Sequence, residues 1–342
     1  MSAVPAPPDH NLIGLDFHRP WPRPKVKGWV IDYHSHLFAH RHQQHWLRVN
    51  RHYGIDAFVT MTPLEEAMGI ARDLPGRVHF IAVPKWFDDS PNWVDDWLRR
   101  LEAFYNLGSR IIKFHMAPGT MAARNYNLET PGIQRIIAEA VSRGMILMTH
   151  VGDPDTWYRD KYTDHAKFGT REEHYRIWED QLKAQRGHTW IGAHLGGNPE
   201  NLPRLQYLLD TYPDLYLDLS ATRWMVREVS ARRDAMREFI IKNADRLLWG
   251  SDQVSGDTRE FDFLASRMSA HRTLWETAYV GPSPIGDPDL PSDQQPITMR
   301  GLALPDETLQ KIYHDTTVRV LGKHGIVFDE PKEDGPAEAA AA

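Results

Sequence analysis

The sequence predicts a single-domain α/β protein, a TIM (β/α)8 barrel, because eight short apolar runs alternate with segments of helical periodicity. Short, near-continuous apolar runs are typical of parallel strands that are buried on both faces. A doubly wound open sheet is the rival fold, but it usually carries a glycine-rich phosphate turn after its first strand, where this chain has His34-Ser35-His36. The predicted strands are residues 30–34, 57–61, 78–83, 110–115, 145–150, 190–194, 215–219 and 247–251.

The segments between these strands have the periodicity of amphipathic helices. In residues 92–106, Trp93, Trp97 and Leu101 fall on one stripe that can face the strands. Residues 131–140 begin with a proline in the first turn, a position that helices tolerate well. Each predicted strand is therefore followed by a helix, as a barrel requires.

The ends of the chain and two connections depart from this repeat. Residues 1–27 are proline-rich and are expected to form an extended arm over a barrel of residues 28–325. Residues 326–342 turn acidic and then alanine-rich, which predicts a disordered tail. Long connections follow strand five (152–186) and strand eight (255–305). In a barrel both leave the face where substrates bind, so we expect lids or specificity loops.

Composition excludes several classes of protein. The net charge of −6 and the absence of a Lys/Arg block argue against a nucleic-acid partner. Without cysteine there are neither disulfides nor thiolate ligands, so a transition metal would be held by His, Asp or Glu. No apolar run is long enough to cross a membrane and no signal-peptide core is present, which gives a cytoplasmic location as the default expectation.

Imidazoles and carboxylates stand at the ends of predicted strands one, five, six and eight. Each one alone has a structural explanation, such as a buried hydrogen-bonded histidine or, for an aspartate, the cap of the next helix. Together, at one end of a barrel, they predict a divalent metal site. By strand parity Gly192 and Gly250 accompany two of these groups, which fits a crowded site. The groups are His34, His36, His150, His194 and Asp252.

These motifs resemble the amidohydrolase superfamily, specifically the amidohydrolase-2 branch that includes aminocarboxymuconate-semialdehyde decarboxylase-like enzymes. The resemblance covers roughly residues 28–322. One departure is His314-Asp315-Thr316-Thr317, where such proteins carry a Gly-Asn-Ala-like stretch. The motifs are Asp-x-His-x-His at 32–36, Lys113 in Ile-Ile-Lys-Phe-His, His150, Ala-His-Leu-Gly-Gly at 193–197, Trp-Gly-Ser-Asp at 249–252 and the closing Arg319-Val320-Leu321-Gly322.

The resemblance implies one divalent ion, commonly zinc with manganese as an alternative, and a bound water. The implied ligands are His34, His36, His150 and Asp252, with His194 as the acid/base or substrate-polarising residue. From its chemistry, Asp252 could also accept the proton of that water. Asp32 is either an acceptor that orients a ligand imidazole or simply the end of a strand.

Other residues are candidates for binding substrate. Lys113 and His115 share parity and are expected to face the barrel mouth. For Lys113 we expect contact with a substrate carboxylate, although a structural ion pair or a metal-bridging carbamate would also use a lysine here. Trp157 and Arg159, in the loop after strand five, predict a small, planar, anionic organic substrate, while packing of the loop is the alternative for the aromatic ring.

Three functions fit this constellation. The first is a metal-dependent hydrolase in which activated water attacks a C–N, ester or lactone bond. The second is non-oxidative decarboxylation with the same metal site, and the third is a barrel that the metal only stabilises. The metal ligands do not separate the two reactions, since both need a Lewis acid and a nearby acid/base. Relatives are often dimers, so a homodimer is expected.

Overall fold

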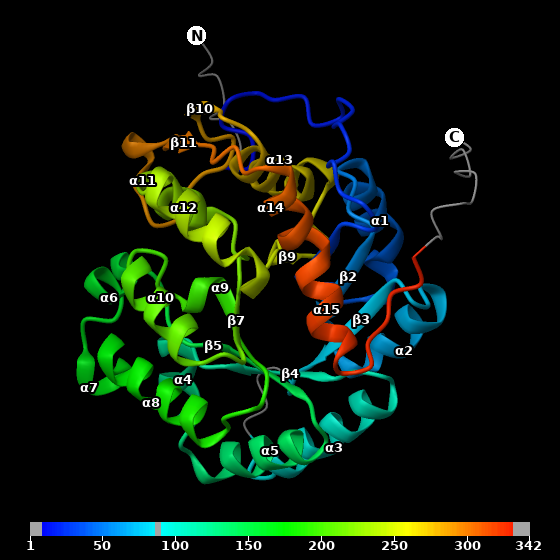
Figure 1. The fold of residues 1–342 in the computed structure, drawn as a ribbon, viewed down its shortest axis with the longest axis vertical. Helices are drawn as coiled ribbons and strands as arrows, with labels where there is room; N and C mark the ends of the chain where they lie inside the picture. Colours follow the sequence, from blue (N-terminus) through cyan, green and yellow to red (C-terminus); the bar gives the residue numbers. More distant parts are fainter. Residues whose placement is uncertain (1–8, 86–89, 331–342) are drawn as a thin grey trace.

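Nine strands form one curled sheet in the computed structural model, which describes residues 9–85 and 90–330. Their order is β8-β7-β6-β5-β4-β3-β2-β1-β9, all neighbours are parallel, and helices surround the sheet (Figure 1). The predicted single-domain TIM barrel is confirmed. The strands are β1 (Ile31–His36), β2 (Ala57–Met61), β3 (Val78–Ala82), β4 (Ile111–His115), β5 (Ile146–His150), β6 (Trp190–Gly192), β7 (Leu215–Asp218), β8 (Leu247–Leu248) and β9 (Gln253–Val254).

Of the predicted eighth strand, residues 247–251, only β8 is a strand; β9 follows beyond its predicted end, and together β8 and β9 close the barrel. β8 pairs with β7, and β9 pairs with β1. Between them the Tyr33 amide donates to the Trp249 carbonyl at 2.9 Å and the Asp252 amide donates to the His34 carbonyl at 2.7 Å. Asp252 is thereby fixed beside the first strand.

Helices follow the strands where the sequence predicts them. In α3 the predicted stripe is buried through Trp97, Leu101 and Phe104, and α5 begins at Pro131. α14, a π-helical turn at Lys311–Asp315 and α15 run on continuously. The helices are α1 (Gln43–His52), α2 (Leu64–Asp73), α3 (Trp93–Asn106), α4 (Pro118–Arg124), α5 (Pro131–Ser142), α6 (Asp155–Asp160), α7 (His165–Phe168), α8 (Arg171–Ala184), α9 (Ala193–Gly196), α10 (Leu202–Thr211), α11 (Arg223–Ala231), α12 (Arg233–Asn243), α13 (Phe261–Glu276), α14 (Asp306–Gln310) and α15 (Thr316–Gly322).

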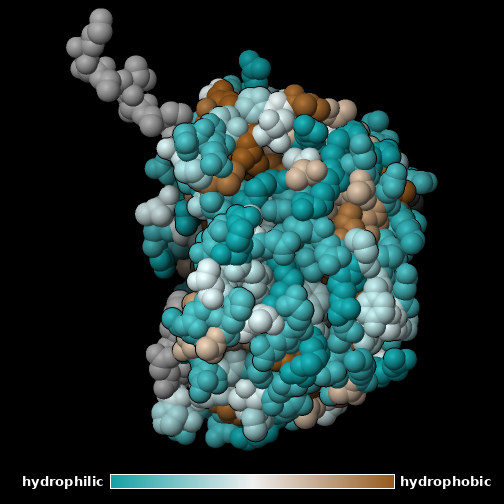
Figure 2. Space-filling view, turned by 90° about the vertical axis from the view of Figure 1, so that its left-hand side faces the viewer, coloured by the Kyte–Doolittle hydropathy of each residue, from teal (hydrophilic) through white to brown (hydrophobic). Residues whose placement is uncertain are grey.

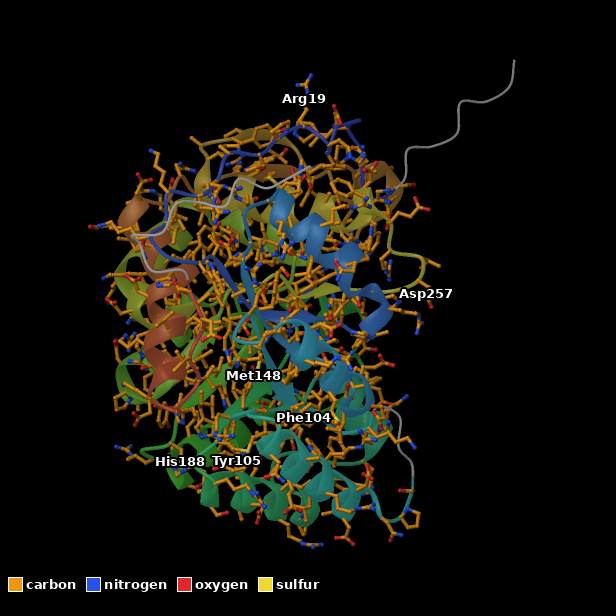
Figure 3. All side chains as sticks on the ribbon, turned by 90° about the vertical axis from the view of Figure 1, so that its right-hand side faces the viewer. Arg19, Phe104, Tyr105, Met148, His188 and Asp257 are labelled. Atoms are coloured by element: carbon orange, nitrogen blue, oxygen red, sulfur yellow. The ribbon has the colours of Figure 1, made fainter. Side chains whose placement is uncertain are left out.

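The core lies between the sheet and its helices. Met148 of β5 and Phe104 of α3 are fully buried and lie inside the ribbon, whereas Arg19 and Asp257 project outward (Figure 3). The two long connections carry α6 to α8 after β5, and α13 with the hairpin β10 (Val280–Pro282) and β11 (Thr298–Arg300) after strand eight. Both follow strand ends on the face that holds the candidate site.

The arm and the C-terminal segment pack on the barrel. Phe17 in the arm is buried, and Arg23 pairs with Asp56. Ile326 and Phe328 are also buried in the core, and the Trp29 amide donates to the Glu330 carboxylate at 3.0 Å. The rest of the predicted tail, residues 331–342, lies outside the described residues.

One face of the molecule is seen in the space-filling view (Figure 2). The face shown in Figure 2 is covered largely by hydrophilic residues, with hydrophobic residues in small separate patches. In the described part of the chain, none of the helices combines the length and the apolar character that crossing a bilayer requires.

Candidate metal centre and active-site cavity

A cavity of about 380 Å³, here called the inner cavity, opens at the carboxyl ends of the strands. Five predicted site residues, from β4 to strand eight, line it, which fits the position of substrate sites in such barrels. The lining residues are His115, Ala117, Gly119, Thr120, His150, Asp153, Trp157, Tyr162, His194, Ala221, Trp224 and Asp252.

His34 presents a lone pair towards Asp252. Its Nδ1 lies 2.8 Å from Oδ2 of Asp218, which is buried and accepts hydrogen bonds, so Nδ1 carries the proton. Burial, reinforced by the charge of Lys113, lowers the pKa of His34, and the ring is therefore neutral at pH 7. Its Nε2 lies 3.3 Å from Oδ1 of Asp252, which is also an acceptor.

Two facing acceptors at this distance suit a cation between them. Burial tends to raise the pKa of Asp252, but a hydrogen bond with His36 and the nearby imidazoles hold it well below its usual value, so the carboxylate is charged. Lys113 Nζ lies 2.8 Å from Nε2 of His34 and provides one positive charge. The residues present therefore fit a divalent ion, which the same lone pair and carboxylate would bind.

The group of side chains best placed to hold an ion is His34, His194 and Asp252. One ligand atom from each lies within 4.8 Å of the other two. The predicted ligands His34 and Asp252 both belong to this group. His194, which is expected to be the acid/base, is its third member.

The other two predicted ligands lie close by. His36 Nε2 is 3.0 Å from Oδ1 of Asp252, and within the described structure its buried Nδ1 has no hydrogen-bond partner. His150 directs Nε2 to Asp153 Oδ1 at 3.1 Å, while its ring centroid is 4.7 Å from that of His194. Both rings thus border the group, although His150 is turned towards the loop after β5.

Ser220 links the rings of His34 and His194. Its hydroxyl oxygen lies 2.8 Å from Nδ1 of each ring and 2.5 Å from Oδ1 of Asp218. A hydroxyl has one proton to donate, and the short distance to a carboxylate favours Asp218 as its acceptor. Nδ1 of His194 then donates to Ser220, which leaves Nε2 of His194 as a lone pair that can bind an ion or act as a base.

The backbone is strained at three residues that line the inner cavity. His194, Ala221 and Asp252 have φ values of 57°, 75° and 53°, a region that residues other than glycine seldom adopt. Such strain persists only where the surrounding contacts impose it, and it concentrates at functional sites. Here it turns His194 and Asp252 towards the same point.

The two glycines beside the predicted ligands have different roles. A Cβ on Gly250 would lie 2.6 Å from Cβ of His34, so this glycine lets strand eight approach the ligand histidine. A Cβ on Gly192 would instead meet Trp178 at 2.8 Å and Leu217 at 2.9 Å. Crowding at the site explains Gly250, whereas packing of the core explains Gly192.

The residues predicted to bind substrate are divided between the cavity and the surface. His115 and Trp157 line the inner cavity, and Lys113 is buried beside His34. Burial lowers the pKa of Lys113 to about 8. Arg159 is not among the lining residues: it pairs with Asp160, and its side chain is 69% exposed.

Comparison with known families identifies the chain. A family model described as Amidohydrolase matches residues 67–323, well over half of the sequence. The chain belongs to the amidohydrolase family. The resemblance drawn from the motifs is thus confirmed, and so is the prediction of an enzyme of this superfamily. The match begins after β1, so the roles of His34 and His36 rest on the geometry described above.

Solved structures similar to this amidohydrolase are distant. An uncharacterised TIM-barrel protein from Bordetella bronchiseptica is 14% identical with a TM-score of 0.47, covering 86% of this chain and 99% of that one. A 5-carboxyvanillate decarboxylase from Novosphingobium aromaticivorans, in complex with manganese and a nitrobenzoic acid, is 11% identical (TM-score 0.47; 88% and 99% covered). A 4-oxalomesaconate hydratase from Rhodopseudomonas palustris is 12% identical (TM-score 0.48; 86% and 96%). No curated protein matches the chain.

Asp32 fits neither of its two predicted roles. In the described structure its carboxylate contacts no imidazole, and it does more than end a strand. Its carboxylate accepts hydrogen bonds from the Ser251 amide at 2.9 Å, the Ser251 hydroxyl at 2.5 Å and the His34 amide at 3.1 Å. Burial outweighs these bonds and raises its pKa to about 7. Asp32 therefore joins strand eight to β1, while Asp218 fills the imidazole-orienting role that Asp32 was predicted to have.

Sequence reasoning missed Asp218, Ser220 and Asp153 of this amidohydrolase. Asp218 ends β7, so the rule that selected the other strand-end groups would have found it. Ser220 follows two residues later, with the spacing of a neighbouring position on one face. Asp153 lies in a loop, where no periodicity signals its contact with His150.

Proposed function

We propose that this amidohydrolase is a metal-dependent hydrolase that cleaves a C–N, ester or lactone bond of a small organic acid. The main support is the neutral His34 ring, whose Nε2 lone pair faces the charged Asp252 carboxylate beside the inner cavity. The proposed ligands are His34, His36, His150 and Asp252, with zinc as the first choice and manganese as the alternative for this N/O set.

The side chains around the proposed ion have separate tasks. When bound, a divalent ion supplies Lewis acidity and lowers the pKa of a coordinated water towards about 7. Asp218 keeps the His34 ring in the tautomer whose Nε2 carries no proton. Nε2 of His194 faces the same point as a lone pair and can take a proton from water. Trp157, Tyr162 and Trp224 line the inner cavity and limit the access of bulk water.

Decarboxylation remains a second candidate because of Lys113. A buried ammonium 2.8 Å from His34 gives a substrate carboxylate a cationic partner directly at the metal centre. In that reaction the inner cavity would hold the carboxylate that leaves as CO₂ while a proton takes its place on carbon, whereas hydrolysis would place the scissile carbonyl there.

Metal analysis and a substrate panel test the proposal. We expect about one divalent ion per purified chain, and turnover of esters, lactones or amides that is lost on chelation and restored by Zn²⁺ or Mn²⁺. Asp252→Asn should lose both the ion and turnover, while Asp210→Asn on the exposed surface of α10 should keep both.

Each other outcome has a distinct meaning. Release of CO₂ from aromatic acids without hydrolysis of any panel member would favour decarboxylation. A fall in melting temperature on chelation without any turnover would favour a metal that only stabilises the barrel. Metal-free protein that hydrolyses the panel would overturn the proposal. The same proposal includes an anionic substrate, which the binding of matched acids and amides would test. It also includes a homodimer, tested by sedimentation, and a cytoplasmic location, tested by cell fractionation.

A further inference from the structure

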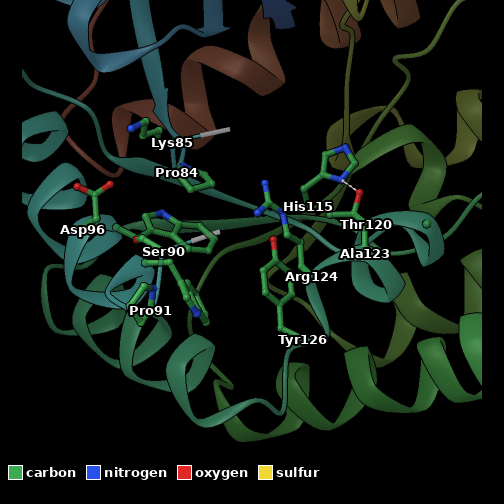
Figure 4. Close-up of a pocket in the computed structure, with 13 residues that line it drawn as sticks. Pro84, Lys85, Ser90, Pro91, Asp96, His115, Thr120, Ala123, Arg124 and Tyr126 are labelled. Carbon is green, nitrogen blue, oxygen red and sulfur yellow. Dashed lines mark hydrogen bonds between the residues drawn. The ribbon is translucent and has the colours of Figure 1, made fainter. Parts of the chain in front are cut away.

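A second, larger cavity adjoins the inner one. This cavity, here called the side cavity, has a volume of about 630 Å³ and lies beside the end of β4, between α3 and α4 (Figure 4). His115, Gly119 and Thr120 line both cavities, so the two adjoin at these residues. Each volume falls within the range of roughly 300–1,000 Å³ that is usual for small-molecule sites.

His115, Gly119 and Thr120 form the junction between the cavities. Thr120 Oγ1 lies 2.9 Å from Nδ1 of His115, which fixes the imidazole at the boundary. At Gly119 a Cβ would meet only Tyr162, its hydroxyl oxygen at 3.8 Å and its Cε1 at 3.9 Å, and the glycine itself places no side chain in the junction. A flat molecule could extend from one cavity into the other.

The walls of the side cavity suit a planar group. Trp93, Trp97 and Tyr126 line it, and the rings of Trp93 and Tyr126 lie 5.5 Å apart with an interplanar angle of 37°. Aromatic walls bury a planar ligand with little loss of side-chain entropy and provide faces for stacking.

The charged groups of the side cavity favour an anion. Arg124 projects from the end of α4 into the space between His115 and Pro84 (Figure 4). Among the described residues that line the side cavity, Asp96 is the acidic one, and it already accepts from Arg100 at 2.9 Å and from Arg99 at 3.2 Å within its own helix. A guanidinium has five N–H donors, so Arg124 can bind a carboxylate in addition to contacts within the protein.

We propose that the side cavity is a second substrate pocket, in which Arg124 binds an anionic group at the end of a planar organic molecule opposite to the reacting bond. The substrate class is then bifunctional: one group reacts near His194 and Asp252, a flat body passes His115, and a carboxylate or similar anion reaches Arg124. This inference rests on the proposed function, because that function places the reacting end in the inner cavity.

A matched pair of ligands tests the pocket. Isothermal titration calorimetry would measure the binding of 2-naphthoate and 2-naphthamide, which share one shape and differ in charge. Chelated protein is used first, so that no metal can hold the carboxylate, and metal-loaded protein second. We expect the acid to bind about tenfold more tightly than the amide, as for a charge-assisted hydrogen bond. In Arg124→Gln this preference should fall to about threefold or less.

Two further variants complete the test. Arg135→Gln removes an exposed arginine of α5 and should keep the full preference. Ala123→Trp fills the side cavity alone and should weaken both ligands. If Arg124→Gln keeps the preference, or if Ala123→Trp binds both ligands as well as the unaltered protein does, the inference is wrong. Neither result depends on a metal, so failure of the metal-dependent function would appear separately, in the metal content and the turnover.

Discussion

The metal centre and the loops that cover it are held by different kinds of interaction. At the centre, buried side chains on strand ends bind one another: Asp218 orients His34, and Asp32 joins Ser251. In the cover, α6 is attached through partly exposed charges, such as Lys161 with Asp289 and Arg171 with Asp155. Buried networks of satisfied hydrogen bonds are rigid, whereas exposed ion pairs contribute little to stability. The centre is therefore preorganised, and the cover can open at low cost.

The largest expected effect is at the centre, from Gly250→Ala. The new Cβ would lie 2.6 Å from Cβ and 2.8 Å from N of His34, which cannot move without losing its contact with Asp218. We expect a loss of about 3 kcal/mol in the free energy of unfolding, measured with denaturant. Gly256→Ala is the matched control in the same segment, because its Cβ would meet only Cγ of the flexible Arg259, at 3.2 Å. Its effect should stay below about 1 kcal/mol, and an equal loss in both variants would contradict the account.

The next effect lies in the cover, at Glu200. Burial, followed by the charge of Glu228, raises the pKa of Glu200 from 4.5 to about 7, and Oε1 accepts a hydrogen bond from the Asp155 amide at the start of α6. A raised pKa means that the folded protein binds the proton more tightly than the unfolded chain. The stabilisation from protonated Glu200 is therefore fully present below pH 4.5 and is lost as the pH rises to about 7.

The magnitude is at most about 3 kcal/mol, because water screens a partly exposed group. Glu200→Gln should flatten this part of the curve of unfolding free energy against pH. Glu238→Gln, on the exposed face of α12, should leave the curve unchanged. If the unfolding free energy of Glu200→Gln falls between pH 4.5 and about 7 as steeply as that of the unaltered protein, another group is responsible for the titration.

At the centre, Asp218→Asn should weaken metal binding more than it weakens the fold. The asparagine keeps the shape but loses the charge that fixes the proton on Nδ1 of His34. Loss of such an orienting partner typically costs about 10- to 100-fold in metal affinity. Competition with a chelator would measure the Kd for Zn²⁺ and Mn²⁺, with Asp210→Asn as the control. Unchanged affinity would show that Asp218 does not orient a ligand.

The difference between the metal centre and the loops that cover it also explains what the sequence could predict. Strand ends follow from apolar runs and parity, so the sequence alone could place His34, His194 and Asp252 together. Contacts of the cover join residues far apart in the chain, such as Trp157 and Asp289, and no local pattern signals them. Trp157 lines the inner cavity, whereas Arg159, two residues later, faces solvent because a short helix turns it away. The side cavity is likewise a product of packing between α3 and α4.

The smallest expected effect is in the cover, from Asp289→Asn. The buried Asp289 carboxylate accepts from Trp157 Nε1 at 2.6 Å and Lys161 Nζ at 2.7 Å, and so joins the two long loops over the inner cavity. The variant should lower the free energy of unfolding by about 1 kcal/mol or less, since Lys161 is partly exposed. Hydrogen exchange should accelerate in α6 and stay unchanged in β1, because only the cover loses an attachment. Asp160→Asn, which removes the exposed partner of Arg159, is the control and should not accelerate α6. Equal acceleration in α6 and β1 would mean that the cover and the centre open as one unit.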